Sequence, residues 1–402
     1  MSSNIKSKNP DDVVVVAAYR TALTKGGRGG FKDVSSDYLL KELTEGFIKK
    51  TKLDPSLVQD VAIGNVCHAR GGDFEHRSAL LAAGIPYTAP FVAINRFCSS
   101  GLIAISQVAN KIRTGEIECG IGGGVESMSK DYGPKLLVQY DPVYADNEQV
   151  KLNQIPMGIT NENVCAKFGI SREDQDRFAA SSFNKAEAAQ KSGKFKDEII
   201  PITSYIEDDD EEDEEGNPLE KKIVVDQDEG IRPGVTPEKL AKLKPAFKEG
   251  GLTTAASSSQ VTDGAALVLL MKRSFAEKHG YPIVAKYIAC TVAGVPPEIM
   301  GIGPAVAIPK ILKKTGLTVD DVSVFEVNEA FAGQCLYSIK SVGIPEEKVN
   351  LNGGAIALGH PMGATGARQY ATILPLLKPG EIGLTSMCIG TGMGAASIIV
   401  RE

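Results

Sequence analysis

Two pairs of similar segments occur in the same order along the chain, and this internal repeat is the feature that most limits its fold. Residues 100–117 (SGLIAISQVANKIRTGEI) resemble residues 365–382 (TGARQYATILPLLKPGEI), with the glycines of both copies at the same separation. Upstream, residues 49–65 resemble residues 313–328. Two matches in one order are hard to obtain by chance. We therefore predict a duplicated unit with pseudo-twofold symmetry and a ligand site where the copies meet.

Each copy alternates strand-like and helix-like segments. Short apolar runs at 12–19, 61–66 and 91–94 predict buried strands. Apolar residues at helical spacing in 38–51 and 99–113 predict amphipathic helices. Such alternation is typical of an α/β fold. A chain of 402 residues is also long enough for two or more packed units.

The region between the copies is more polar and more highly charged than the copies themselves. Residues 171–190 read as a highly charged helix, and the carboxylate run 207–215 (EDDDEEDEE) is predicted to be a solvated loop tip. We therefore expect an inserted, more polar region rather than a third copy. The predicted division is an N-terminal half at 1–130 completed by about 251–280, an inserted loop domain at 131–250, and a C-terminal half at 281–402.

Composition excludes several classes of function. The net charge is −6, and without the acidic run the remainder is only mildly and diffusely basic, which disfavours nucleic acid as a partner. No stretch approaches the ~20 apolar residues of a membrane helix. The seven cysteines are dispersed without a CxxC pair, which is typical of a reducing compartment. Cys67, His68 and His76 lie close in sequence, but their spacing does not repeat, so no metal site is predicted.

Two segments at matching places in the copies carry groups suited to nucleophilic chemistry. In NRFCSSG, Cys98 lies where a strand passes into a helix, so the positive end of the helix dipole would stabilise its thiolate. In GHPMGATG, glycine and proline fix the backbone around His360, which could deprotonate a thiol. The alternatives are a small apolar residue filling a strand–helix corner and a structural histidine.

Two further segments end predicted strands. In MCIGTGMG, Cys388 precedes a glycine turn at Gly390, whose backbone N–H could serve an oxyanion hole. The glycine spacing is not GxGxxG, which disfavours a dinucleotide enzyme. In VNEAFA, Asn328 could orient a water or a carbonyl. The alternative is that this segment only indicates the start of a helix.

Together these four segments resemble the signature blocks of the thiolase family, in order and spacing, and the similarity extends from about residue 12 to 402. The likeness is greatest to the peroxisomal 3-ketoacyl-CoA thiolases of fungi and plants. It implies two α/β halves, each with a five-stranded mixed sheet, stacked as α-β-α-β-α around a CoA-binding loop domain. It also implies a homodimer without a cofactor, with 3-ketoacyl-CoA and CoA as substrates. A peroxisomal location follows from the likeness; cytoplasm and mitochondrion stay open, because the expected N-terminal leader is not visible in MSSNIKSKNPDD.

The resemblance also implies roles for the residues. The Cys98 thiolate would attack the 3-keto carbonyl with His360 as base, and Cys388 would protonate the departing acetyl-CoA enolate. Oxyanions would be held by a water on Asn328 together with His360, and by the backbone N–H groups of Cys98 and Gly390.

For the ligand, the resemblance implies CoA contacts from Arg232 and Ser259 and an acyl channel lined by Met157. Ala256 and Ser257 stand where the family usually has glycine and asparagine, so backbone freedom and an amide are lost in the CoA-contacting stretch. The expected function is thiolytic cleavage of 3-ketoacyl-CoA in fatty-acid β-oxidation. The alternatives are an acetoacetyl-CoA thiolase working in the synthetic direction and a weakly active thiolase-like paralogue.

Overall fold

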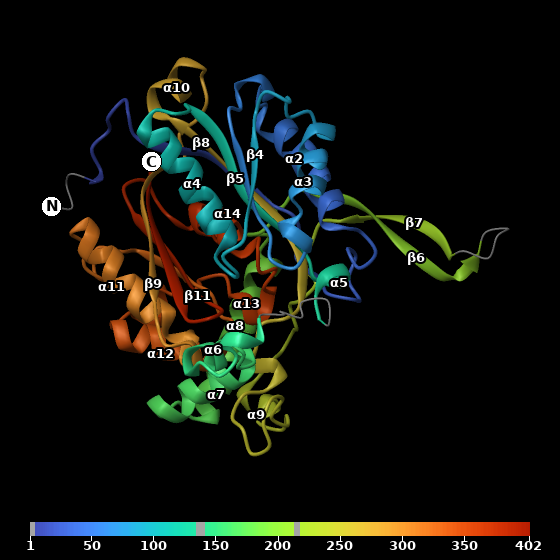
Figure 1. Cartoon of the computed structure of the whole chain (residues 1–402), viewed down its shortest axis with the longest axis vertical. Helices are drawn as coiled ribbons and strands as arrows, with labels where there is room; N and C mark the ends of the chain where they lie inside the picture. Colours follow the sequence, from blue (N-terminus) through green and yellow to red (C-terminus); the bar gives the residue numbers. More distant parts are fainter. Residues whose placement is uncertain (1–4, 134–140, 213–217) are drawn as a thin grey trace.

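The computed structural model describes residues 5–133, 141–212 and 218–402. In these residues a sheet of ten strands forms the centre, and a two-stranded ribbon projects from it (Figure 1). The strands are β1 Val13–Arg20, β2 Thr24–Lys25, β3 Val61–Gly64, β4 Phe91–Ile94, β5 Cys119–Ser127, β6 Ile202–Glu212, β7 Pro218–Val225, β8 Thr262–Lys272, β9 Ala285–Gly294, β10 Val324–Val327, β11 Ile382–Ile389 and β12 Met393–Arg401.

Helices cover both faces of the sheet and fill the space between its halves. The α-helices are α2 Ser36–Thr51, α3 Asp73–Ala82, α4 Ser100–Thr114, α5 Met128–Asp131, α6 Glu148–Asn153, α7 Met157–Phe168, α8 Arg172–Lys191, α9 Pro237–Leu240, α10 Arg273–Lys278, α11 Gly303–Thr315, α12 Ala332–Val342, α13 Ala355–Leu358 and α14 Thr365–Ile373. The 3₁₀ turns are η1 Pro55–Leu57, η2 Ala69–Gly71, η4 Pro142–Tyr144, η5 Ala255–Ser257, η6 Pro297–Ile302, η7 Glu346–Lys348 and η8 Leu374–Leu376.

The strand order shows the predicted duplication. In the N-terminal half the order is β4-β3-β5-β8-β1, with β3 parallel to β4 and β5, and β8 antiparallel to its neighbours. In the C-terminal half the order is β10-β11-β12-β9 with the same directions, and a parallel bridge from Phe325 to Val349 takes the place of the fifth strand. Antiparallel pairs between β1 and β9 join both halves into one sheet.

The two repeated helices meet in the middle of the molecule, where Figure 1 shows α4 and α14 close together. The first turn of each holds a glycine of the repeat, and both glycines lie at this contact. A Cβ on Gly101 would lie 2.7 Å from the carbonyl oxygen of Gly363, and one on Gly366 would lie 2.4 Å from the backbone nitrogen of Leu102. Only glycine allows these backbones to approach so closely. The glycines that the two copies share therefore form the contact between them.

Layering follows from these contacts. Helices α2 and α11 pack on outer faces, while α4 and α14 pack between the sheet halves with β5, β8 and β11. Buried aliphatic residues form one core below α4 and α14 and another under the outer helices. The predicted strands and helices of the N-terminal half are confirmed, with shifts of one to two residues at their ends.

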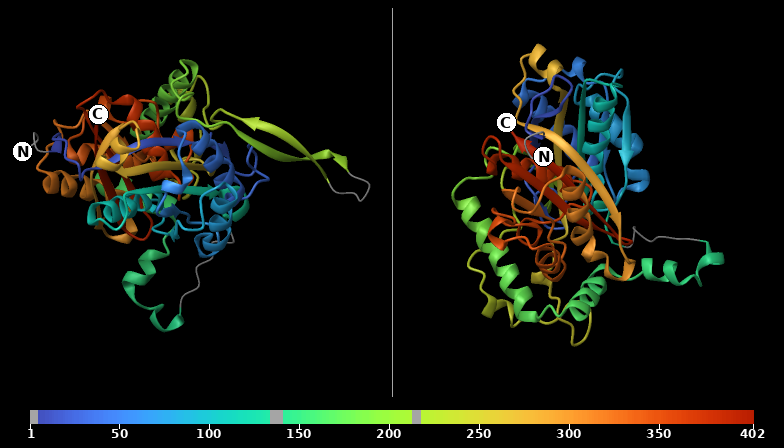
Figure 2. Two further views of the ribbon diagram at one scale, coloured as in Figure 1. Left: turned by 90° about the horizontal axis from the view of Figure 1, so that it is seen from above. Right: turned by 90° about the vertical axis from the view of Figure 1, so that its left-hand side faces the viewer.

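The predicted loop at the acidic run is wrong for the residues that the structure describes. Residues 207–212 continue strand β6, which pairs with β7 in a ribbon that extends from the body (Figure 2). Residues 213–215 of the run lie outside the described residues. Backbone hydrogen bonding between two strands does not depend on the charge of the side chains, so a charged segment can still pair.

No helix in the described residues combines the length and apolar character needed to span a bilayer.

Candidate active site

Cys98 lies in a tight turn between β4 and α4. The preceding residue, Phe97, has φ of 45°, which is uncommon for a side chain larger than glycine. The Ser100 hydroxyl holds the turn, because it accepts the Arg96 N–H at 2.8 Å and donates to the Phe97 carbonyl at 2.6 Å. The turn directs the cysteine toward a cavity while its backbone stays fixed.

The expected easy ionisation of this thiol is wrong for the structure. Burial raises the pKa of Cys98 to about 11; backbone N–H groups of Gly390 and of Cys98 itself act in the opposite direction, and the nearby Glu126 charge raises the pKa further. The loss of water around the sulfur outweighs the stabilisation of the thiolate by the two N–H groups. The resting sulfur is therefore a thiol, and a base has to remove its proton during the reaction.

His360 is held in one orientation by its neighbours. Its Nδ1 lies 2.6 Å from the Thr365 hydroxyl, which in turn donates to the Pro361 carbonyl at 3.2 Å. The hydroxyl oxygen is thus left to accept the Nδ1 proton, and Nε2 carries the lone pair. The Asn328 amide nitrogen lies 3.4 Å from Nε2.

The charge state of His360 suits a base. Burial lowers its pKa to about 3, and the Arg368 charge contributes in the same direction. The imidazole is therefore neutral throughout the physiological range and can accept a proton at Nε2.

Asn328 directly follows β10, and Cys388 lies on the neighbouring strand β11. The Asn328 N–H donates to the Ser386 carbonyl at 2.9 Å, two residues before Cys388 on β11. Cys388 is completely buried against Ala330 and Phe331. Burial raises its pKa far above the usual range, and the Cys98 charge raises it further, so the two sulfurs are within electrostatic reach. In the described residues, Asn328 Oδ1 is a buried acceptor without a partner.

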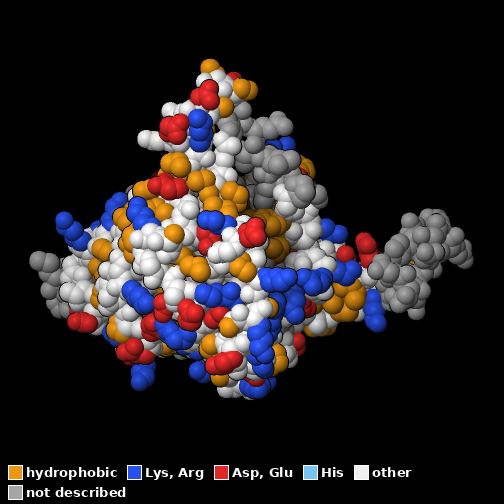
Figure 3. Space-filling view, turned by 90° about the horizontal axis from the view of Figure 1, so that it is seen from below, with side chains coloured by type: hydrophobic (Ala, Val, Ile, Leu, Met, Phe, Trp, Pro, Cys, Tyr) orange, Lys and Arg blue, Asp and Glu red, His pale blue; other side chains and the backbone are white. Residues whose placement is uncertain are grey.

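Cys98 opens on a cavity of about 870 Å³. Phe97, Met157, Met362 and Gly390 share its wall, so the structure brings together the predicted nucleophile, the glycine turn and the predicted channel residue. His360, Asn328 and Cys388 are buried and do not line this cavity. In the space-filling view from below, hydrophobic side chains gather in a hollow at the foot of a projection (Figure 3).

The two expected CoA residues lie elsewhere. Arg232 is exposed, and its guanidinium lies 6.0 Å from the ring centre of Phe183. Ser259 is half-buried, and its N–H donates to the Ala330 carbonyl at 2.9 Å, which ties it to the Asn328 segment. In the same stretch, the Ser257 hydroxyl accepts the Thr254 N–H at 2.9 Å. The serine that replaces asparagine therefore supports its own turn.

Sequence reasoning missed Thr365 and Glu126. Thr365 stood within the GHPMGATG segment, but its role depends on the distance between its hydroxyl and the ring of His360. Glu126 ends the glycine-rich strand β5 and is completely buried. The available sequence signal was a carboxylate near the end of an apolar strand.

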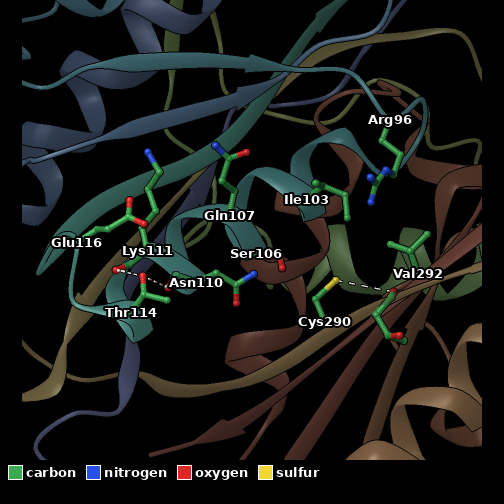
Figure 4. A pocket seen from close by; sticks show the side chains of 11 residues that line it. Arg96, Ile103, Ser106, Gln107, Asn110, Lys111, Thr114, Glu116, Cys290 and Val292 are labelled. Carbon is green, nitrogen blue, oxygen red and sulfur yellow. Dashed lines mark hydrogen bonds between the residues drawn. The ribbon is translucent and has the colours of Figure 1, made fainter.

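A second cavity, of about 410 Å³, lies between α4 and β9 (Figure 4). Its wall includes the polar side chains of Arg96, Asn110, Lys111 and Glu116. It also contains Cys290, a half-buried thiol whose sulfur lies 3.9 Å from the Thr291 carbonyl oxygen. It holds none of the residues predicted to be catalytic.

Side chains of the segment around Cys67 have other partners. His68 Nδ1 lies 3.1 Å from an Asp131 carboxylate oxygen, and His76 Nε2 lies 2.9 Å from the Ser36 hydroxyl. In the described part of the chain, no three His, Cys, Asp or Glu side chains are grouped as metal ligands.

With this geometry in view, comparisons with known proteins decide the family. The thiolase N-terminal domain model matches residues 13–274, and the thiolase C-terminal domain model matches residues 281–401. The chain belongs to the thiolase family. The sequence resemblance is therefore confirmed.

Thiolases of several organisms are similar over their full length. 3-Ketoacyl-CoA thiolase B, peroxisomal, of Candida tropicalis is 65% identical over 99% of this chain and 96% of that protein. The dimeric peroxisomal thiolase of Saccharomyces cerevisiae superposes with a TM-score of 0.91 at 50% identity, covering 100% of both chains. The acetyl-CoA acetyltransferase of Bacillus anthracis has a TM-score of 0.85 at 36% identity, over 97% of this chain and 99% of that one. The expected five-layered fold of two similar halves is confirmed.

Proposed function

We propose that this thiolase is a 3-ketoacyl-CoA thiolase, which cleaves 3-ketoacyl-CoA with CoA into acetyl-CoA and a shortened acyl-CoA. One observation carries the proposal: Cys98 opens on a large cavity with apolar walls, and Met362 in the same wall belongs to the loop that carries the neutral, oriented His360. A thiol transfers acyl groups between thioesters without a large change in bond energy, and a neutral imidazole can both remove and return the proton. Neither a cofactor nor a metal takes part in this scheme.

The first half of the reaction forms an acyl-enzyme. His360 Nε2 takes the Cys98 proton, and the sulfur attacks the 3-keto carbon. The bond between C2 and C3 then breaks, its electron pair stays on acetyl-CoA as an enolate, and Cys388 gives its proton to C2. The raised pKa of Cys388 suits this step, because a weakly acidic thiol holds its proton until a strong base such as an enolate forms.

The second half transfers the acyl group to CoA. Cys388, which lost its proton in the first half, takes the CoA thiol proton; the CoA sulfur attacks the Cys98 thioester, and His360 returns its proton to the departing Cys98 sulfur. The unpartnered Asn328 Oδ1 is suited to hold a water that, together with His360, donates to one oxyanion. The N–H groups of Cys98 and Gly390, which lie against the sulfur, are suited to the other. One such donor is worth about 3–4 kcal/mol.

The acyl cavity favours a degradative thiolase over an acetoacetyl-CoA thiolase. Its volume of about 870 Å³ is larger than a four-carbon acyl group fills. Its wall includes the apolar side chains of Phe97, Met157 and Ile155. A short-chain enzyme would leave this apolar surface exposed to water. Rates of thiolysis across C4 to C16 3-ketoacyl-CoAs test this point, and highest kcat/KM at C4 would support the alternative.

We propose that CoA binds across the polar surface next to this cavity, with Arg232 and Ser259 as contacts. Lys239, Lys242, Lys244 and Lys248 are exposed in and after α9, and Lys and Arg side chains gather on the face that Figure 3 shows. Cations on that side suit the phosphates of CoA.

We also propose a homodimer that pairs along β4. This strand ends the sheet order at the N-terminal half, and its residues are half-exposed. Phe74, Leu81 and Tyr87 nearby are exposed apolar side chains, with Tyr87 83% exposed. An open edge with apolar neighbours is suited to pairing with a second copy. Tyr87→Glu should shift the protein from dimer to monomer in sedimentation analysis, and an unchanged dimer would place the interface elsewhere.

The division into an N-terminal half at 1–130 with 251–280, a loop domain at 131–250 and a C-terminal half at 281–402 is proposed as the domain structure. Strand β8, from the late segment, lies between β1 and β5, which supports assigning it to the first half. A peroxisomal location is proposed because the similar yeast proteins are named for that organelle.

The decisive experiment is brief incubation with acetoacetyl-CoA followed by mass analysis of peptides. An acetyl group on the peptide that contains Cys98 is expected. Labelling at Cys388 alone, or at no cysteine, would contradict the proposed roles.

A further inference from the structure

Glu126 is a buried carboxylate near the candidate active site that the reaction above does not use. It lies at the end of β5 with no exposed surface. A buried carboxylate needs donors to offset the loss of water, and here backbone N–H groups supply them.

Three such bonds come from two loops that belong to different halves. The Val66 and Cys67 N–H groups, in the loop after β3, donate at 3.1 and 2.9 Å. The Gly363 N–H, in the loop that carries His360, donates at 2.8 Å. One carboxylate therefore joins the loop beside the nucleophile to the loop of the base.

The neighbours of these donors form the cavity wall. Val66 and Met362, which directly precedes Gly363, both line the cavity on which Cys98 opens. The Gly363 carbonyl oxygen faces the first turn of α4, where a Cβ on Gly101 would lie only 2.7 Å away. The Gly363 residue thus touches Glu126 on one side and the helix after Cys98 on the other.

Glycine at position 363 is required by this arrangement. A Cβ there would lie 2.8 Å from the Glu126 carboxylate and 2.7 Å from the Asn65 Cα. The carboxylate and the glycine therefore fit each other, and a small shift of either loop would break the 2.8 Å bond.

The charge of Glu126 acts on the nucleophile in an unfavourable direction. It raises the pKa of Cys98, and burial raises the pKa of Glu126 itself to about 7. If the carboxylate only filled space, a neutral side chain could replace it, and the pKa of Cys98 would then be lower. The hydrogen bonds by which Glu126 links the two loops are a function that a space-filling side chain would not have.

We propose that Glu126 is a positioning residue that fixes the His360 loop against the loop after β3, which lines the cavity beside Cys98. The kinetic test of this role rests on the proposed thiolase function, whereas the exchange test below does not.

The test uses Glu126→Gln in the full-length enzyme, because glutamine keeps the shape but removes the charge and one acceptor. The kcat of thiolysis should fall at least about tenfold, equivalent to about 1.4 kcal/mol, with KM changed less than about threefold. Alkylation of Cys98 by iodoacetamide at pH 8.5 should become faster, because the thiol loses a neighbouring negative charge. Labelling of the buried Cys119 and Cys335 should stay unchanged.

Opposite changes in kcat and in Cys98 labelling distinguish positioning from general loosening. Asp60→Asn is the matched control: Asp60 is a buried carboxylate before the other end of β3, paired with Lys111, and its loss should change kcat less than about twofold. Any other pattern in Glu126→Gln, including unchanged kcat or equal labelling gains at Cys119 and Cys335, would overturn the proposal.

Hydrogen exchange supplies a readout that does not need turnover. In the wild-type protein, the Gly363 amide should exchange slowly although it lies in a loop, and in Glu126→Gln it should exchange at least about tenfold faster, because a neutral amide is a weaker acceptor. Rapid exchange in the wild type would overturn the proposal. If the wild type also lacked thiolase activity, the proposed function would fail while this measurement still decided the role of Glu126.

Discussion

Two half-buried cysteines, Cys98 and Cys290, face two separate cavities, and burial raises the pKa of both to about 11. Charge would favour Cys290, because Lys314 and Arg96 lower its pKa, whereas Glu126 raises the pKa of Cys98. Ease of ionisation therefore does not mark the nucleophile.

The surroundings of the sulfurs make the difference. Backbone N–H groups from Gly390 and from its own residue lie against the Cys98 sulfur, and its cavity is large and mostly apolar. Cys290 has the Ser106 hydroxyl and the Thr291 carbonyl nearby, in a smaller cavity that several charged side chains line. Cys98 is therefore distinguished by donors for the oxyanion, by room for the acyl group and by a cavity wall that includes Met362 from the His360 loop.

The largest effect is expected when the two cysteines are removed in turn. Cys98→Ala should reduce thiolysis at least about 10³-fold, because the covalent intermediate cannot form. Cys290→Ala should change it less than about twofold. Thiolytic rates of both purified variants with one 3-ketoacyl-CoA give the answer, and comparable losses would remove the distinction between the cavities.

Removal of the base should cost somewhat less. His360→Gln is expected to lower kcat about 10²–10⁴-fold, because the thiol then loses its proton acceptor. Alkylation of Cys98 at pH 8.5 should change less than about threefold, since a neutral imidazole does not set the resting ionisation of the sulfur. Parallel losses of kcat and alkylation would instead show a resting ion pair.

Cys388→Ser should separate the two halves of the reaction. Acylation of Cys98 is expected to persist, while exchange of the α-protons of acetyl-CoA should fall about 10²-fold, because a hydroxyl is a weaker acid than a thiol. Proton exchange followed by NMR in deuterated buffer measures this. Unchanged exchange would count against Cys388 as the acid.

The smallest expected effect is a difference in how alkylation of Cys98 and of Cys290 responds to pH and to nearby charge. Because both thiols have a pKa near 11, alkylation of each should rise about tenfold per pH unit from pH 7 to 10. Lys314→Ala should slow labelling of Cys290 about twofold, since a cation that favours the thiolate is lost, and leave Cys98 unaffected. Site-resolved mass analysis after iodoacetamide treatment measures both, and a plateau for Cys98 below pH 9 would contradict its raised pKa.

Much of this could be predicted from the sequence because the information is local. The repeated glycines, the alternating strands and helices, and the segments around Cys98, Asn328, His360 and Cys388 are all short patterns of residue type and spacing. They predicted the fold class, the family and which residues to examine. The repeat even identified Gly101 and Gly366, although only the structure showed that they meet.

Only the tertiary structure decided the properties that depend on distance and burial. The helix start at Cys98 indicated an acidic thiol, but desolvation outweighs the local donors and raises its pKa. The joining of β1 to β9, the extension of β6 into the acidic run and the three bonds of Glu126 each connect residues through space. Residue type and spacing along the chain fix the chemistry that is available, whereas water exclusion and contacts between remote loops fix how that chemistry is tuned.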